Sequence, residues 1–151
     1  MSADSKVIRF ETCRFDELSA LQLHEILRVR AEVFALEQRC LYLDPDEHDL
    51  EAIHVRGLLN GHLVAYARYF PKGDAIKIGR VLTTAAVRGT GAGKQLMRFT
   101  LDHIGARPCI LEAQAYLESF YAAFGFRSTG PIYELDNIPH LPMRRTATTE
   151  P

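Results

Sequence analysis

The sequence predicts an α/β fold in which a mixed central sheet carries helices on both faces. Residues 53–59 and 62–70 have the pattern of strands, and Asn60-Gly61 between them favours a type I′ hairpin turn. A further apolar run, residues 75–83, leads through a glycine-rich turn into residues 91–104, whose apolar positions recur with helical period. This strand–turn–helix order predicts a parallel strand pair joined by a right-handed crossover.

The N-terminal part predicts a short strand at residues 7–10, followed by a helix. Ser19 and Gln22 can form a capping box where this helix begins. Its apolar face comprises Leu23, Ile26, Leu27, Ala31 and Phe34. Residues 41–49 are acidic and contain a proline, and we therefore expect a loop there.

The strand at residues 75–83 is interrupted by Gly79, which predicts a bulge in this central strand. After the helix at 91–104 we expect a central strand at residues 109–113 and another helix at residues 115–124. Gly125 is the expected C-cap of that last helix.

The C-terminal part predicts final strands at Phe126 and residues 132–135 and a polar tail from Arg144 onward. The chain has 151 residues, enough for one domain with a proper core and too few for two. We therefore expect a single domain over residues 1–151, ordered over about 6–145 and flexible at 1–5 and 146–151.

Composition excludes several classes of protein. The net charge of −1 argues against binding to nucleic acid or an anionic membrane, which needs a concentrated basic face. No apolar run approaches the roughly 20 residues of a membrane span, and the N-terminus lacks the apolar core of a signal peptide. Cys13, Cys40 and Cys109 are odd in number and widely spaced, which predicts reduced thiols and a cytoplasmic protein. No zinc spacing occurs, and we expect no metal.

The glycine-rich turn at residues 87–94 predicts a phosphate site. Glycine allows close backbone approach, and the first N–H groups of a helix have no intrahelical partners. A P-loop is excluded because Arg88 stands where its first glycine belongs and Gln95 replaces the hydroxyl residue after Gly93-Lys94. The dinucleotide pattern G-x-G-x-x-G/A does not fit in either register.

Arg88, Gly91 and Gly93 fit the pattern Gln/Arg-x-x-Gly-x-Gly/Ala, which resembles the pyrophosphate-binding motif of the GCN5-related N-acetyltransferases (the GNAT family). Downstream, Phe120-Tyr121 and Gly125-Phe126 resemble this family's second signature, in the expected order and spacing. Three segments resemble its ElaA-like branch: residues 33–38, 78–81 and 136–143.

The resemblance implies a GNAT-type fold with acetyl-CoA as cosubstrate. Backbone groups of the turn would hold the pyrophosphate, those of residues 81–83 would pair with the pantetheine amides, and Gln114 stands where many relatives have asparagine. The implied cofactor-binding residues are Val81, Leu82, Thr83, Arg88, Gly89, Thr90, Gly91, Ala92, Gly93, Lys94 and Gln114. Tyr121 matches the family's general acid, which protonates the leaving thiolate.

The general base is not fixed by the sequence. Lys77 stands where some relatives carry a glutamate, and a lysine of ordinary pKa is a poor base at neutral pH. The candidates for the base or the acceptor site are Glu37, Glu112, His140 and His48, or the base is water.

The acidic residues Asp44, Asp46, Asp49 and Glu51 do not form a calcium loop, because the required glycine and terminal glutamate are missing. We expect instead a flexible acidic loop over the acceptor site that favours a cationic acceptor.

Together these observations predict an N-acetyltransferase in which a primary amine of a small molecule or peptide attacks acetyl-CoA directly in a ternary complex. A ping-pong route through Cys109 or Cys40 lacks a paired base in the sequence. The alternatives are a non-catalytic acyl-CoA sensor and a subunit whose partner supplies the missing group. A homodimer is also compatible with the sequence.

Overall fold

The computed structural model describes residues 6–147. The flexible end predicted at 1–5, and residues 148–151 of the one predicted at 146–151, lie outside the described residues. The chain divides into two compact units, which we describe separately. The first contains the residues up to Arg68 together with Arg80–His103, and the second contains Tyr69–Gly79 and the residues from Ile104 on. The expectation of a single domain stays a prediction.

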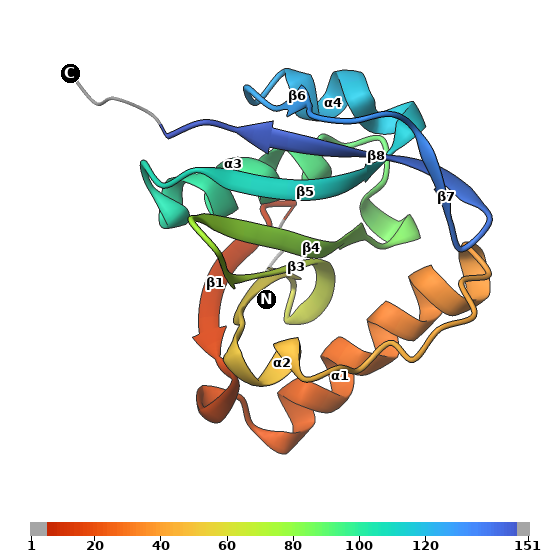
Figure 1. Ribbon diagram of the computed structural model, residues 1–151. Helices are drawn as coiled ribbons and strands as arrows, with labels where there is room; N and C mark the ends of the chain where they lie inside the picture. Colours follow the sequence, from red (N-terminus) through yellow and green to blue (C-terminus); the bar gives the residue numbers. More distant parts are fainter. Residues whose placement is uncertain (1–5, 148–151) are drawn as a thin grey trace. The chain divides into compact units, whose positions relative to one another are not determined.

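Strands and helices alternate along the chain much as predicted (Figure 1). The strands are β1 (Arg9–Arg14), β2 (Ile53–Leu59), β3 (His62–Lys72), β4 (Ala75–Thr83), β5 (Cys109–Gln114), β6 (Arg127–Ser128), β7 (Tyr133–Leu135) and β8 (Ile138–Arg145). The α-helices are α1 (Ala20–Arg30), α2 (His48–Glu51), α3 (Ala92–Ile104) and α4 (Glu118–Ala122). A π-helix, η2 (Ala31–Glu37), continues α1, and the 3₁₀ segments are η1 (Phe15–Glu17), η3 (Ala85–Val87) and η4 (Ala115–Leu117).

The strands are hydrogen-bonded in the order β1-β2-β3-β4-β5-β8-β6, with β7 paired to β8. β4 and β5 are parallel, and Ile76 lies opposite Cys109, which confirms the predicted parallel pair around the glycine turn and α3. The pairs β1–β2 and β5–β8 are antiparallel. The mixed α/β sheet predicted from the sequence is therefore confirmed.

In the first unit, local sequence signals fix the helix and the hairpin. The Ser19 hydroxyl accepts from the Gln22 N–H at 3.1 Å, and the Gln22 side chain accepts from the Ser19 N–H at 2.9 Å, so the capping box is confirmed. Asn60 and Gly61 have φ of 52° and 82°, as a type I′ turn requires. The core of this unit includes Ile26, Val29, Val33, Phe34, Leu58, Leu63, Tyr66 and Leu82.

The irregularity predicted in the strand at 75–83 is present in β4. The left-handed backbone falls on Arg80, with φ of 50°, directly after Gly79. A residue with a Cβ pays about 1–2 kcal/mol for this conformation. Interactions of the Arg80 side chain, described below, offset that cost.

In the second unit, the C-terminal strand was missed by the sequence analysis. The polar tail predicted from Arg144 is wrong at its start, because Arg144 and Arg145 belong to β8 and lie opposite Ile110 and Cys109. Pro139 and Pro142 hid this strand, since proline is depleted in sheets. The predicted C-cap is confirmed: Gly125 has φ of 94° and its N–H donates to the Ala122 carbonyl.

Candidate functional site

The glycine-rich turn of the first unit presents bare backbone where α3 begins. Gly89 and Gly91 have φ of 79° and 85°, a conformation that glycine adopts without strain. A Cβ placed on either residue would meet nothing within 4 Å, so this side of the turn is open. The first intrahelical hydrogen bond of α3 runs from the Gln95 N–H to the Gly91 carbonyl (3.1 Å). The N–H groups just before Gln95 therefore lack intrahelical acceptors. The turn therefore fits a phosphate group.

The Arg88 side chain turns back onto its own unit. Its Nη2 donates to the Thr83 carbonyl oxygen at 2.7 Å and lies 2.6 Å from Glu37 Oε1. Two predicted site residues, Glu37 and Arg88, are thus brought together, and Glu37 is engaged by a guanidinium instead of being a free base. Of the β4 segment predicted to face pantetheine, Leu82 is buried and the Thr83 carbonyl is shared with Arg88.

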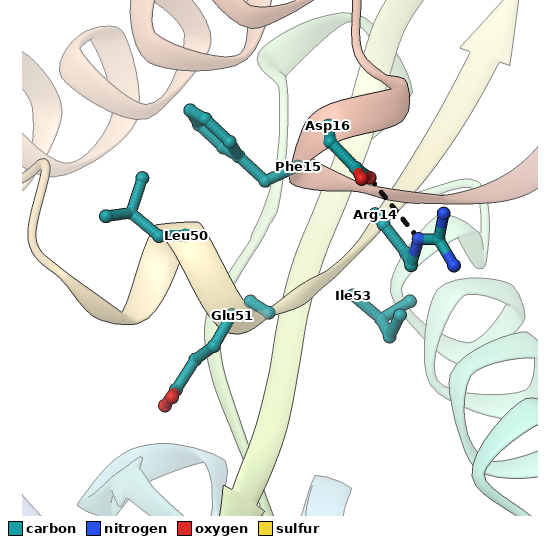
Figure 2. A pocket seen from close by; sticks show the side chains of 7 residues that line it. Arg14, Phe15, Asp16, Leu50, Glu51 and Ile53 are labelled. Atoms are coloured by element: carbon teal, nitrogen blue, oxygen red, sulfur yellow. Dashed lines mark hydrogen bonds and ion pairs between the residues drawn. The ribbon is translucent and has the colours of Figure 1, made fainter.

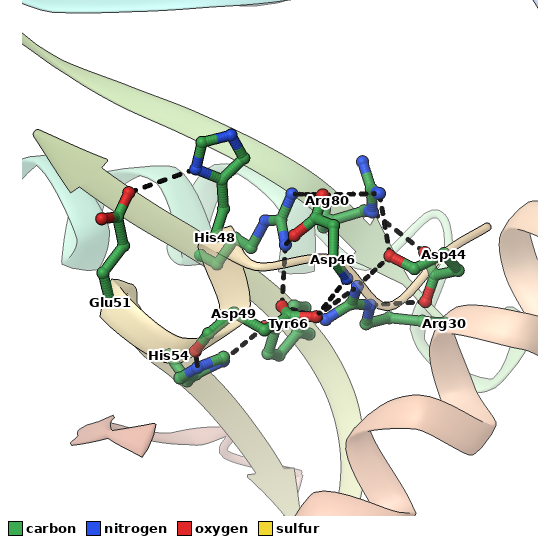
Figure 3. Close-up of polar contacts among 10 residues, drawn as sticks. Arg30, Asp44, Asp46, His48, Asp49, Glu51, His54, Tyr66 and Arg80 are labelled. Atoms are coloured by element: carbon green, nitrogen blue, oxygen red, sulfur yellow. Dashed lines mark hydrogen bonds and ion pairs between the residues drawn. The ribbon is translucent and has the colours of Figure 1, made fainter. Parts of the chain in front are cut away.

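The acidic segment was predicted to be a flexible loop over the acceptor site that favours a cationic acceptor. Its aspartates are paired with arginines, while its place over the acceptor site stays a prediction. Figure 3 shows Asp44, Asp46 and Asp49 gathered with Arg30 and Arg80. Arg30 pairs with Asp44 at 2.8 Å and with Asp49 at 2.7 Å. Arg68 pairs with Asp46 at 2.6 Å and with Asp49 at 2.7 Å. Arg80 pairs with Asp44 at 2.9 Å and with Asp46 at 3.4 Å. We call these six side chains the ion-pair cluster. Their formal charges cancel, so the segment offers a cationic acceptor little net attraction.

Electrostatics keep the cluster ionised although it is largely buried. Hydrogen bonds from Arg68 lower the pKa of Asp46 to about 2, against the opposing effect of burial. For Asp49, burial would raise the pKa, but hydrogen bonds and charge from Arg30 and Arg68 outweigh it and lower the pKa. Arg30 is fully buried, and burial would lower its pKa, yet Asp49, Tyr66 and Asp44 raise it.

The cluster also holds the irregular part of β4. The Arg80 guanidinium donates to the Asp44 carbonyl at 2.9 Å and lies over the Tyr42 ring, 4.8 Å from its centroid. These contacts fix the left-handed residue of the strand to the acidic segment. Arg80 lies in the segment 78–81, but no role could be predicted for it, because its partner Asp44 is 36 positions away in the chain.

Beneath the cluster lies a buried histidine, His54. Its Nε2 is 2.9 Å from the Asp49 carbonyl oxygen and its Nδ1 is 2.6 Å from the Tyr66 hydroxyl. Since a carbonyl only accepts, Nε2 carries the proton and Nδ1 accepts from Tyr66. Burial lowers the pKa of His54 and raises that of Tyr66, so both are neutral at physiological pH.

His48, the fourth base candidate, lies on α2 outside this buried layer. Its Nδ1 is 3.1 Å from Glu51 Oε1, and both side chains are exposed. Nearby, a pocket of about 260 Å³ is lined by Arg14, Phe15, Asp16, Leu50, Glu51, Ala52 and Ile53 (Figure 2). Its arginine is paired with Asp16, and it contains none of the predicted site residues.

In the second unit, Tyr121 of α4 is buried, with 6% of its surface exposed. It packs edge-on against Phe120 and Phe126. Burial raises its pKa to about 12, so its hydroxyl stays protonated at neutral pH. No side chain in the described part of the chain hydrogen-bonds this hydroxyl. A protonated, uncommitted phenol suits the acid predicted at this position.

Both carboxylate oxygens of Glu112, on β5, are engaged by neighbouring side chains. Its Oε1 accepts from the Tyr133 hydroxyl at 2.6 Å, and its Oε2 lies 3.1 Å from Lys77 Nζ. The hydrogen bond from Tyr133 lowers the pKa of Glu112, against burial, and Lys77 lowers it further. A carboxylate stabilised in this way is a weak base at neutral pH.

Tyr133 is a site residue that the sequence analysis missed. Asp136 and Asn137 have φ of 52° and 61° and form a two-residue turn between β7 and β8. The register of this hairpin places Tyr133 opposite His140. The Asp136-Asn137 dipeptide was the sequence signal that could have revealed that Tyr133 lies opposite His140.

His140, on β8, has its Nδ1 2.7 Å from the Ile138 carbonyl oxygen. Its ring is 6.1 Å from that of Tyr133. β8 also pairs with β5, where Gln114 lies opposite His140. The second unit thus brings together Gln114, Glu112 and His140 of the predicted site residues, with Lys77 beside Glu112.

The cysteines do not form a nucleophilic pair. Within residues 6–147, Cys13, Cys40 and Cys109 form no disulfide, and the last two are buried. Burial raises the pKa of Cys109, which disfavours the thiolate that a ping-pong route would need. Over residues 6–147 no cluster of metal-ligating side chains occurs. Nor is any helix in that range long and apolar enough to cross a membrane.

Comparison with known proteins agrees with the geometry. The model of the acetyltransferase (GNAT) domain matches residues 47–147. The chain is 41% identical over 148 residues to Protein ElaA of Escherichia coli, covering 92% of this chain and 97% of the relative. A UPF0039 protein of Synechocystis is 41% identical over 138 residues, covering 86% of this chain and 90% of that protein.

Solved structures show the same relationship. The crystal structure of E. coli ElaA matches with a TM-score of 0.86 at 40% identity, over 92% of this chain and 99% of that one. An acyl-CoA N-acyltransferase of Pseudomonas aeruginosa matches with a TM-score of 0.89 at 34% identity, over 93% of this chain and all of that one. The chain therefore belongs to the GNAT acetyltransferase family and resembles its ElaA-like branch most closely.

Proposed function

We propose that this protein is an N-acetyltransferase that moves an acetyl group from acetyl-CoA to a primary amine. The observation that carries the proposal is the open glycine turn before α3, with Gly89 and Gly91 in left-handed conformation. A similar solved structure is described as an acyl-CoA N-acyltransferase, which supports an acyl-CoA donor.

In this proposal, backbone N–H groups of residues 88–94 hold the pyrophosphate, and the β4 segment 81–83 pairs with the pantetheine amides. Gln114 adds a side-chain hydrogen bond to the cosubstrate. The amine nitrogen attacks the thioester carbonyl, the C–S bond breaks, and the Tyr121 hydroxyl donates a proton to the leaving sulfur. The described cysteines form no disulfide, which favours a reducing compartment, and we place the reaction in the cytoplasm.

The experiment is coenzyme A release measured as free thiol, with spermidine, glucosamine, kanamycin and a lysine-containing peptide as four probe amines. Amine-dependent release, with the acetylated amine found by mass spectrometry, supports the enzyme. Binding of acetyl-CoA without release for any of the four supports the sensor alternative. Native mass spectrometry of the same sample reports whether the protein forms a homodimer or needs a partner subunit.

A further inference from the structure

We propose that His140 is the general base that takes the proton from the acceptor amine. The inference rests on the proposed function and deepens it, because the base is the role that the sequence left open. It concerns the second unit alone. A general base needs an available lone pair, and the competing carboxylate and phenol of this unit are engaged.

The tautomer of His140 is set by its own strand. Nδ1 lies 2.7 Å from the Ile138 carbonyl oxygen, and a carbonyl oxygen only accepts. Nδ1 therefore carries the proton, and the lone pair of the neutral ring is on Nε2. Although 91% of the His140 surface is covered (9% is exposed), no hydrogen bond to Nε2 forms within residues 6–147. Nε2 does not belong to the side-chain polar atoms that are both fully buried and without a hydrogen-bond partner.

The sheet places this nitrogen beside groups of suitable chemistry. His140 is opposite Tyr133 on one side and Gln114 on the other, and residues opposite each other in antiparallel strands share a face of the sheet. Glu112 precedes Gln114 by two positions on β5, so it lies on the same face. The imidazole thus has the proposed cosubstrate contact, Gln114, on one neighbouring strand, and nearby lies Glu112, hydrogen-bonded to Tyr133 and paired with Lys77.

The competing bases are engaged. Glu112 accepts hydrogen bonds from the Tyr133 hydroxyl and from the Lys77 ammonium, and the lowered pKa leaves it a stable carboxylate. Tyr133 is itself held protonated, because burial and Glu112 raise its pKa. Because the charge of Glu112 is already balanced by Lys77, neither its carboxylate nor the Tyr133 hydroxyl is available as the base.

The proton balance is complete. The acceptor ammonium gives one proton to His140 Nε2, which leaves a lone pair on nitrogen. That pair forms the C–N bond, and the C–S electrons leave with sulfur, which takes a proton from Tyr121. The nitrogen loses a second proton, which restores Tyr121 through water, and His140 releases its proton to solvent.

The titratable groups on elements packed against β8 must be separated from His140 in any pH profile. They are Cys109 and Glu112 on β5, Arg127 on β6, Tyr133 and Glu134 on β7, and Tyr116 in η4.

The test has two readouts. Long-range ¹H–¹⁵N NMR of histidine-labelled wild-type protein, with His140 assigned by the His140→Gln variant, shows which ring nitrogen is protonated at pH 7.5. Steady-state kinetics then compare wild type, His140→Gln and the exposed control His62→Gln. The acceptor is whichever of spermidine, glucosamine, kanamycin and the lysine peptide the wild type acetylates fastest.

We expect the NMR spectrum to show a proton on Nδ1. We expect kcat to fall about 100-fold or more in His140→Gln, as loss of a general base does. The acid limb of kcat/KM should disappear, the rate should recover at alkaline pH, and acetyl-CoA binding should stay unchanged. His62→Gln should match wild type.

A proton on Nε2, or wild-type kcat and pH profile in His140→Gln, would overturn the proposal. If none of the four amines is acetylated although acetyl-CoA binds, the transferase function fails, and the base role fails with it even where NMR confirms the tautomer. Failure of the base alone is distinct, because wild type then acetylates an amine and His140→Gln does so equally well.

Discussion

At the scale of single residues, a substitution of Tyr121 separates the chemical step from acetyl-CoA binding most clearly. Its hydroxyl is protonated and uncommitted, so Tyr121→Phe removes a proton donor without removing a structural bond. We predict that kcat falls about 100-fold while the dissociation constant of acetyl-CoA changes little. Tyr116→Phe, an exposed tyrosine in the adjacent 3₁₀ segment, is the matched control. Wild-type turnover in Tyr121→Phe would contradict the role of Tyr121 as the general acid.

His54 makes the stability of the fold depend on pH. Burial holds its folded-state pKa below 6.5, so the unfolded chain takes up the proton first. Stability from the neutral ring is therefore present above pH 6.5 and is lost as pH falls toward the folded pKa, by at most about 1.4 kcal/mol per pH unit. The charged groups that face it are Asp49, Arg30 and Arg68, which remain ionised over this range.

Urea denaturation at pH 7.5, 6.5 and 5.5 tests this expectation. We predict a falling free energy of unfolding in wild type and in His62→Gln, and a much smaller slope in His54→Gln. The aspartates of the ion-pair cluster do not contribute to this window, because the pKa values of Asp46 and Asp49 are below 3.8. A wild-type slope in His54→Gln would assign the effect to another group.

At the scale of elements, the ion-pair cluster joins the acidic segment to α1, β3 and β4. Asp49 is 5% exposed and bonded to both Arg30 and Arg68, so Asp49→Asn leaves buried charge unbalanced. We predict a loss of about 3–5 kcal/mol in the free energy of unfolding. Asp74→Asn, which breaks the exposed pair with Arg144, should cost less than about 1 kcal/mol. Equal effects of the two variants would show that the cluster does not stabilise the fold.

The pair between Glu37 and Arg88 links the π-helix η2 to the glycine turn. A carboxylate 2.6 Å from the guanidinium cancels charge that the turn could offer to a diphosphate. Glu37→Gln should therefore tighten acetyl-CoA binding several-fold at low salt and leave kcat unchanged, as measured by calorimetry and thiol release. Weaker binding would mean that Glu37 orients Arg88 for the ligand, and a large loss of kcat would restore Glu37 as the base.

Local sequence patterns were enough to predict most elements of this fold. The capping box of Ser19, the Asn60-Gly61 turn and the cap at Gly125 depend on neighbours a few residues away, and all three are confirmed. β8 was missed because Pro142 lies inside it, and η2 was missed because a π-helix has the same apolar residues as an α-helix.

The site was harder to predict because its contacts are not local. Arg30 pairs with Asp49, which is 19 positions away in the chain, and Arg80 pairs with Asp44, which is 36 positions away. No sequence-spacing rule connects residues so far apart. Without those partners, the aspartates looked like free negative charge. Similarly, Lys77 and Glu112 are 35 positions apart, and only the sheet shows that each neutralises the other.

At the scale of the whole molecule, family membership and the glycine turn support the central proposal, which is that the protein binds acetyl-CoA. The most direct measurement is a thermal-shift titration with acetyl-CoA, with ATP and NAD as controls, on wild type, Gly91→Ala and Gly73→Ala. Both glycines have positive φ and open space, so each alanine should cost about 1–2 kcal/mol of stability.

The account predicts a saturable rise in Tm with acetyl-CoA alone, for wild type and Gly73→Ala, and a much weaker rise for Gly91→Ala. No shift in wild type, or an equal shift with ATP, would contradict it and leave the glycine turn as a connection between β4 and α3.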